Sequence, residues 1–230
     1  MLIDLHAHSK GISRCCKANA ETVISEAKAK GIDGIVLTNH FQKSYYANST
    51  ETEFVKAYID EYYKVKSLAE QNGFVCFFGI EVTMEKYPKV HMLIYGVAPS
   101  FLENNLGICD LTQSELYDLV KRNNGILIQA HPYRNGTTVL DPLYLDGIEI
   151  SCHPLYKKSY CDEIISFAKQ HSLSVTCGGD FHADTYRPSC GMYVPESIKT
   201  EFELSEFIKN KKDVTLRHHE PNGEPVEITL

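Results

Sequence analysis

Short apolar runs alternate along this chain with longer stretches in which apolar residues recur at helical spacing. The runs predict strands at 1–5, 34–37, 75–78, 91–97, 126–129, 147–150 and 173–177. The stretches predict helices from Asn19 to Gly31, from 51 to 71, after the capping-box residue Thr112, after Ser159, and at about 204–211. Strands that are separated by helices pair in parallel, so the pattern predicts an α/β fold.

The number of these units favours a barrel over an open sheet. Six or seven strand–helix units fit into 230 residues, and barrels of this length commonly form one domain. No linker, internal repeat or break in composition divides the sequence. We therefore expect a single domain over residues 1–230.

Histidines and carboxylates lie at the ends of these apolar runs. They are His6, His8, His40, Glu81, His91, His131, Asp180 and His182. In a βα barrel the C-terminal ends of the strands face one mouth, so we expect these side chains to converge. A lone histidine is more often a buried core residue than a ligand, but the recurrence at equivalent positions favours a divalent-metal centre. The pattern predicts a metal-dependent hydrolase.

Composition and charge are those of an ordinary globular protein, with 43% hydrophobic and 23% charged residues. The net charge of −7 gives no sign of general nucleic-acid binding. Neither a signal segment nor a membrane span is evident, so we expect a soluble, cytoplasmic protein without membrane partners. The eight cysteines form no C-x-x-C pair. We therefore expect reduced structural thiols instead of a structural zinc site.

Five motifs, taken in order, resemble those of the polymerase and histidinol phosphatase (PHP) superfamily. They are DLHAHS at 4–9, LTNH at 37–40, GIEV at 79–82, AHP at 130–132 and GGDFH at 178–182. The resemblance covers about residues 2–194. It implies a distorted (β/α)7 TIM-like barrel of the PHP type, and a phosphoesterase that uses two or three divalent ions of zinc, manganese or iron.

The resemblance also implies a division of the ligands among the metal ions. The first ion would be held by His6, His8, Glu81 and Asp180. Glu81 would bridge to a second ion, which would also be held by His91 and His131. A third ion would draw on His40 and His182.

One position departs from the family pattern. The third ion usually takes an Asp or His where this chain has Arg14, and a guanidinium cannot bind a metal. Three alternatives remain: Cys15 completes the site as a thiolate, the third ion is absent or weakly held, or Arg14 takes its place and binds phosphate. We favour the last two together, so Arg14 is an expected catalytic residue. A side chain turned to solvent would have no role. Without a third ion, His40 or His182 is the expected general acid.

The expected reaction is the hydrolysis of a small phosphate ester, of the histidinol phosphate or nucleotide type, by a metal-bridged hydroxide. Arg134 and Arg187 follow two of the motifs and are expected to bind the substrate phosphate. His153 is expected to line the pocket. Asp4 is expected to orient a ligand histidine.

Two other functions stay open. One is an amidohydrolase-type enzyme that cleaves C–N bonds, which a metal-bridging lysine would favour over the glutamate found here. The other is a non-catalytic PHP-like module that only binds a partner, which a metal-free protein would favour.

Overall fold

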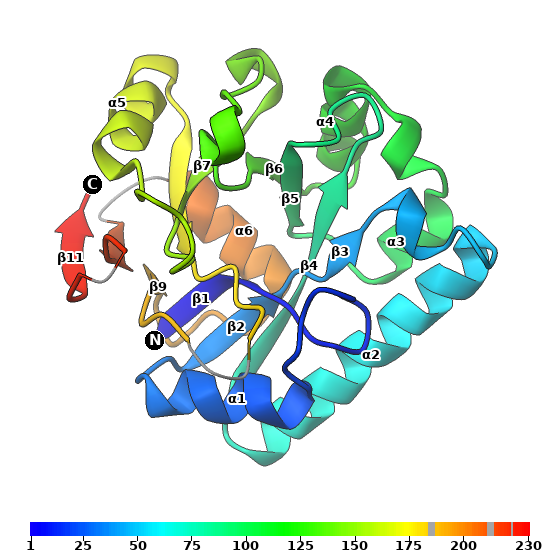
Figure 1. Ribbon diagram of the computed structural model, residues 1–230, viewed down its shortest axis with the longest axis horizontal. Coiled ribbons are helices and arrows are strands. Elements are labelled where there is room, and N and C mark those ends of the chain that lie inside the picture. Colours follow the sequence, from blue (N-terminus) through cyan, green and yellow to red (C-terminus); the bar gives the residue numbers. More distant parts are fainter. Residues whose placement is uncertain (184–186, 211–213, 222) are drawn as a thin grey trace.

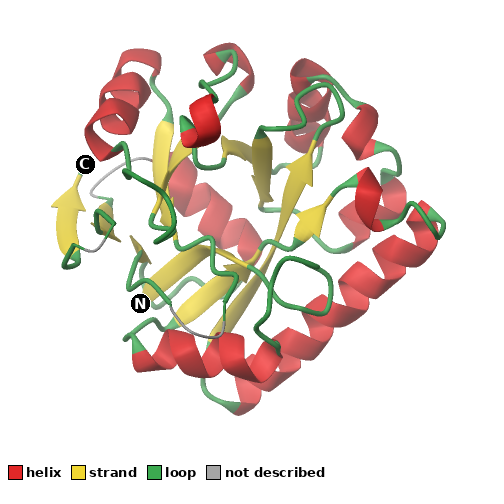
Figure 2. Ribbon diagram, viewed as in Figure 1, coloured by secondary structure: helices red, strands yellow, loops and turns green. Residues whose placement is uncertain are grey.

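The computed structural model describes residues 1–183, 187–210, 214–221 and 223–230. Figure 1 shows a curled sheet with helices on its outer side, and Figure 2 shows the same view coloured by secondary structure. The strands are β1 (Leu2–Ala7), β2 (Gly34–Leu37), β3 (His40–Phe41), β4 (Val75–Thr83), β5 (His91–Tyr95), β6 (Ile126–Gln129), β7 (Gly147–Ser151), β8 (Ser174–Gly178), β9 (Gly191–Tyr193), β10 (Thr215–His218) and β11 (Val226–Thr229). The α-helices are α1 (Ala20–Ala29), α2 (Glu51–Gln71), α3 (Ser100–Asn104), α4 (Gln113–Arg122), α5 (Cys161–His171) and α6 (Glu201–Asn210).

The main path of the sheet runs β11-β10-β9-β1-β2-β4-β5-β6-β7-β8, and β3 pairs with β4. Strands β1, β2 and β4 are parallel, as are β6, β7 and β8. The curl brings the two parallel groups together, because Ala7 at the end of β1 forms an isolated parallel bridge with Phe181 just after β8. The predicted α/β class is therefore confirmed as a mixed α/β fold with a curled sheet.

The regular (β/α)7 alternation is not confirmed. Strand β5 is antiparallel to both β4 and β6, and β9, β10 and β11 form an antiparallel edge beside β1. The seven residues 84–90 between β4 and β5 are too few for a parallel crossover, which needs a dozen or more. The short connection therefore produces a hairpin.

Helix capping follows the prediction at two of the three predicted positions, Asn19 and Thr112, and Thr50 forms a further capping box that was not predicted. The side chain of Asn19 accepts a hydrogen bond from the Thr22 amide, and both Thr50 and Thr112 head complete capping boxes. Helix α5 differs from the prediction. Its N-cap is Tyr160, at φ +59° and without a side-chain cap, while Ser159 Oγ accepts the Cys161 amide proton over 3.2 Å.

Two buried tyrosines hydrogen-bond to backbone carbonyls in or next to the strands. The Tyr58 hydroxyl donates to the carbonyls of Asn39 (2.6 Å) and Gly79 (3.1 Å), and the Tyr95 hydroxyl donates to the Leu5 carbonyl over 2.8 Å. These bonds satisfy backbone acceptors beneath the polar edge of the sheet. Within the described ranges, no helix combines the length and apolarity that a bilayer crossing needs.

Candidate metal centre

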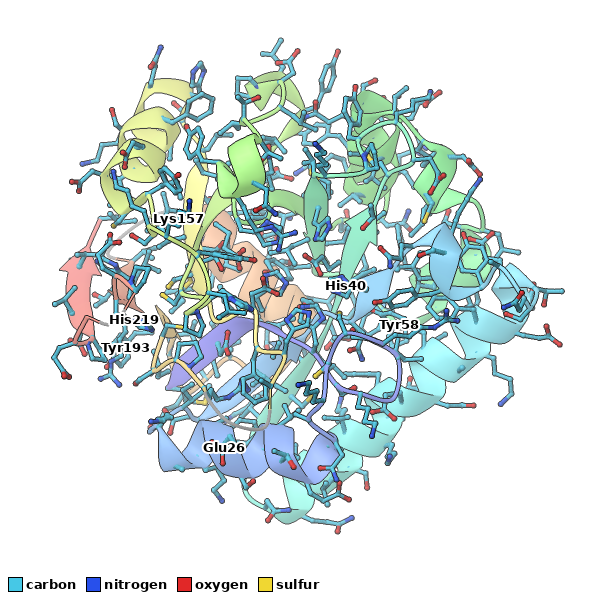
Figure 3. All side chains as sticks on the ribbon, in the orientation of Figure 1. Glu26, His40, Tyr58, Lys157, Tyr193 and His219 are labelled. Carbon is cyan, nitrogen blue, oxygen red and sulfur yellow. The ribbon has the colours of Figure 1, made fainter. Side chains whose placement is uncertain are left out.

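The eight predicted ligands lie together at one edge of the curled sheet; they are called the histidine cluster below. His6 and His8 come from the end of β1, Glu81 from the end of β4 and His131 from just after β6. His91 begins β5, and because that strand is antiparallel its first residue lies at the same edge. His40, in β3, lies near the middle of the view in Figure 3. The predicted convergence is observed.

Glu81 is the hub of the cluster and is fully buried. Its Oε1 lies 2.8 Å from His91 Nδ1, 3.1 Å from His131 Nε2 and 3.4 Å from His6 Nε2. Its Oε2 lies 3.5 Å from His8 Nε2 and contacts His40 Nδ1. One carboxylate thus faces five imidazoles, an arrangement suited to bridging two ions.

Asp180 is the second buried carboxylate of the cluster. Its Oδ1 lies 3.2 Å from His8 Nε2, 3.2 Å from His182 Nδ1 and 3.5 Å from His6 Nε2. Its backbone has φ +48°, in the left-handed region that costs energy for a residue with a side chain. The ligand atoms form overlapping groups of three: His6–His8–Asp180, His6–Glu81–His131, His40–Glu81–His91 and His8–His40–His182.

Several buried polar atoms at the centre of the cluster face one another without hydrogen bonds. Within the described residues, His6 Nε2, His40 Nδ1 and Glu81 Oε2 have no hydrogen-bond partner. The last two atoms touch, but they are not aligned for a hydrogen bond. Buried polar atoms are costly when unpaired, so lone pairs that converge in this way fit metal ions between them.

The electrostatics of the cluster also suit cations. Burial alone would raise the pKa of Glu81, but the imidazoles of His40 and His91 outweigh it and hold that pKa well below its usual range. Burial is likewise outweighed at Asp180, where His6 and hydrogen bonds from His182 lower the pKa. Both carboxylates are therefore ionised at neutral pH, and they place two negative charges in a buried site.

Two residues that the sequence analysis missed set the orientation of the first histidine pair. Glu149, in β7, accepts the Nδ1 proton of His6 over 2.9 Å, and its other oxygen accepts the His131 amide proton over 3.0 Å. Ser13 Oγ lies 3.1 Å from His8 Nδ1. With Nδ1 engaged, Nε2 of each ring faces the cluster as a ligand. An acid inside the apolar run 147–150 was the available signal for Glu149.

Asp4 and Arg187 have other partners than expected. Asp4 accepts the amide protons of His6 (3.1 Å) and Gly179 (2.8 Å), so it holds backbone and orients no histidine ring. Arg187 has a fully buried side chain that pairs with Asp4 over 3.2 Å and lies over the Phe181 ring. It is therefore not available to a substrate phosphate, and the substrate role predicted for Arg187 is wrong.

Arg14 is exposed and turns away from the cluster. Its guanidinium donates to the carbonyls of Ser44 and Tyr45 and lies over the Tyr45 ring. The neighbouring Cys15 thiol lies 3.5 Å from the Tyr45 hydroxyl; although burial opposes ionisation, interaction with the imidazoles of His182 and His40 lowers the pKa of Cys15 to about 5. Of the alternatives for this position, the geometry favours Cys15 and disfavours the catalytic role expected for Arg14.

A cavity of about 340 Å³ adjoins the histidine cluster at His131. Its lining includes Arg134, Tyr156, Lys157 and Lys158; Lys157 is labelled in Figure 3. Arg134 Nη1 donates to the Tyr156 hydroxyl over 2.5 Å and lies 3.6 Å from Asp180 Oδ2, so this predicted residue is at the site. The His153 ring stacks on Tyr156 with a centroid distance of 4.6 Å. Tyr156, which donates to Asp180 Oδ2, was not anticipated.

No protein-family model and no curated protein matches the sequence. Solved structures do match. A two-domain protein from Bacteroides vulgatus that contains a predicted PHP-like metal-dependent phosphoesterase gives a TM-score of 0.70 at 18% identity, over 95% of this chain and 65% of its own. The chain has a PHP-like fold. The resemblance drawn from the five motifs is thereby confirmed at the level of the fold.

Two further structures share this PHP-like fold. The lesion-specific endonuclease EndoQ from Pyrococcus furiosus gives a TM-score of 0.63 at 16% identity, over 96% of this chain and 59% of its own. An amidohydrolase from Chromobacterium violaceum, with bound sulfate and no metal, gives 0.54 at 16% identity, over 90% and 97%. This chain spans less than two thirds of the Bacteroides and Pyrococcus proteins.

Proposed function

We propose that this chain is a metal-dependent phosphoesterase that hydrolyses a small phosphate ester. The observation that supports this most is the buried Glu81 carboxylate, which faces five imidazoles beside a cavity with basic side chains. Net charge does not oppose the proposal, because a pocket with local positive charge attracts phosphate even on an acidic protein.

The cluster has enough ligands for two or three divalent ions of zinc, manganese or iron. Such ions, when bound, lower the pKa of a bound water and neutralise phosphoryl oxygens. His6, His8 and Asp180 would hold one ion, and Glu81 would share a second with His91 and His131. Cys15 would join His40 and His182 at a third position, where its thiolate would favour zinc.

The adjoining cavity supplies the substrate contacts. Its volume of about 340 Å³ is in the range of small-molecule sites, roughly 300–1,000 Å³. Arg134 donates a hydrogen bond to Tyr156, so its planar guanidinium group is oriented before substrate binds. The group can then bind phosphate through two parallel hydrogen bonds. Lys157 adds positive charge to the lining, the neighbouring Lys158 is paired with Glu163, and the His153 ring stacks on the Tyr156 ring.

A proton donor for the leaving oxygen is also present. Burial lowers the pKa of His182, but its contacts with Asp180 and the nearby Cys15 outweigh this and raise it to about 10. Without an ion at the third position, His182 therefore carries a proton at neutral pH and acts as the general acid. With an ion there, the ring is a ligand and the leaving group must take its proton from water.

The proposal is tested by elemental analysis of the purified protein together with a panel of phosphomonoesters under manganese and zinc supplementation. We expect at least two metal ions per chain, and a loss of kcat/KM of at least about 100-fold in Glu81→Gln, because second-layer losses alone cost 10- to 100-fold. Glu70→Gln, on the exposed face of α2, is the matched control. A metal-free protein that leaves every phosphate ester intact would overturn the proposal.

The amidohydrolase reading retains one supporting observation, the shared fold with the Chromobacterium protein. The centre of the cluster, however, is occupied by a glutamate and not by a lysine. Cleavage of amides by the metal-loaded protein, with phosphate esters left intact, would replace the phosphoesterase proposal with this one.

A further inference from the structure

Three cysteines that are far apart in the sequence meet in the interior, outside the histidine cluster. Cys152 directly follows β7, Cys177 lies in β8 and Cys190 directly precedes β9. Their exposures are 2%, 0% and 0%. The three sulfur atoms lie within 4.8 Å of one another. Spacings of 25 and 13 residues hide this group from any search for closely paired cysteines.

The separation of the sulfur atoms matches that of ligands on one metal ion. Cys152 Sγ and Cys177 Sγ are 3.7 Å apart. Two thiolates on a tetrahedral zinc ion, each with a Zn–S bond of about 2.3 Å, are separated by about 3.8 Å. The chain thus holds this pair at the ligand spacing without any movement of the strands.

The surroundings also favour a thiolate at this point. Hydrogen bonds from the thiols of Cys177 and Cys190 and from the His219 amide hold the pKa of Cys152 well below the usual range despite burial, whereas burial raises the pKa of Cys177 and of Cys190, so Cys152 is the thiolate of the group. Cys177 Sγ lies 3.2 Å from the Arg217 carbonyl, which accepts its proton while no ion is bound. A sulfur atom that already accepts several hydrogen bonds is suited to metal binding, because these bonds stabilise the thiolate form that metals bind.

A buried positive charge lies near the group. Arg187 pairs with Asp4 through Nη1, while its Nε and Nη2 have no hydrogen-bond partner in the described part of the chain. Burial lowers the pKa of Arg187, and Asp4 and Cys190 oppose that shift. This guanidinium would partly offset the net negative charge of three thiolates on a divalent ion.

We propose that Cys152, Cys177 and Cys190 bind one thiophilic cation, zinc above all, at a structural site separate from the histidine cluster. Three protein ligands leave the fourth tetrahedral position for a water or the His219 imidazole. The ion clamps the ends of β7 and β8 to the start of β9. Asp180 lies three residues after Cys177, so the ion would help to hold the left-handed backbone of this ligand in place.

Cobalt substitution tests this site without reference to activity. The full-length Cys15→Ser variant is used as the parent, so that no thiolate is offered by the histidine cluster. After removal of metal under reducing conditions and titration with Co²⁺, we expect sulfur-to-cobalt charge-transfer absorption in the near ultraviolet. Cys190→Ser in this parent should lose at least a third of the intensity, because one of three thiolates is gone. Cys76→Ser, at another buried free cysteine, should leave it unchanged.

X-ray absorption of the zinc-loaded parent covers the case in which a cysteine variant fails to fold. We expect sulfur neighbours at about 2.3 Å from zinc. A folded parent with neither the cobalt absorption nor these neighbours would overturn the proposal. Glu81→Gln should retain both signals. A metal-loaded protein with Glu81 intact that shows both signals but hydrolyses no phosphate ester would count against the proposed function alone.

Discussion

The tautomer and ring orientation of a ligand histidine depend on the group that contacts the ring nitrogen not used to bind the metal. Glu149 contacts Nδ1 of His6, and Ser13 contacts Nδ1 of His8. The Nε2 atom of each ring therefore faces the carboxylates of the cluster. Glu149 is itself fully buried and also fixes the His131 backbone. A carboxylate in this position makes the imidazole a stronger donor to a metal and locks its ring orientation.

Glu149→Gln is therefore expected to weaken metal binding by about 10- to 100-fold while the fold is kept. The amide retains the shape of the side chain but loses the charge that supports His6. The measurement is competition for Zn²⁺ against a chromophoric chelator, with Glu70→Gln as the control at an exposed site. Equal Zn²⁺ affinities in Glu149→Gln and the unchanged protein would show that the contact between Glu149 and His6 does not support metal binding.

The metal ligands could be predicted from the sequence more accurately than the side chains that surround them. Each ligand lies at one end of an apolar run, His91 at the start of its run, so the strand pattern located it. Arg14 was placed at the site because it stands where the family pattern has a metal ligand, and Arg187 because it follows a ligand motif, but position along the chain does not fix side-chain direction. Arg187 turns inward to Asp4, and Arg14 turns outward to the carbonyls of residues 44 and 45.

The helices and strands were predicted where local chemistry decides them. The range 51–71 of α2 was predicted to the residue from its helical spacing and the glycine that follows it. Strand β4 runs on to Thr83, beyond the predicted range, and so carries Glu81 within it. The antiparallel direction of β5 was missed because the alternation of strands and helices was taken to imply parallel pairing throughout. The connection 84–90 is too short for a parallel crossover, and its length was the signal for the antiparallel direction.

The capping box of α2 allows a test at the level of the element. In Thr50→Ala, the Glu53 amide loses its acceptor, and the free energy of unfolding should fall by about 1 kcal/mol. Thr52→Ala, two residues on and exposed within the helix, is the matched control and should be neutral or slightly stabilising. Urea denaturation monitored by circular dichroism measures both. A Thr50→Ala protein as stable as the control would show that tertiary packing alone fixes this helix start.

At the scale of the molecule, the curl of the sheet brings the parts of the site together. Residues at 6 and 182 lie in one cluster because the end of β1 meets the segment after β8. That convergence follows from the general rule that strand ends of a barrel share a mouth, so it was predictable from the motif order. The antiparallel edge of β9, β10 and β11 and the meeting of three cysteines were not predictable, because each depends on long-range packing between segments without local signals.

The charge state of the whole cluster leads to a prediction about metal uptake. In the metal-free protein, buried carboxylates outweigh desolvation and raise the pKa of His6 well above its usual value and that of His40 to about 9, while that of His182 is about 10. These rings carry protons at pH 7, and a metal binds only the neutral imidazole. Protons therefore compete with the metal, so apparent affinity should rise as pH increases from 7 toward 9 to 10, and binding should release protons.

Calorimetric titration of the metal-free protein in buffers of different ionisation enthalpy counts the protons released at pH 7. His182→Gln should release about one fewer than the unchanged protein, because its raised pKa makes it one of the rings that must lose a proton. His171→Gln, on the exposed end of α5, should release the same number as the unchanged protein. An affinity that does not change with pH would mean that the ions bind elsewhere than among these imidazoles. Equal release by both variants would remove His182 from the ligand set and leave it as a proton donor.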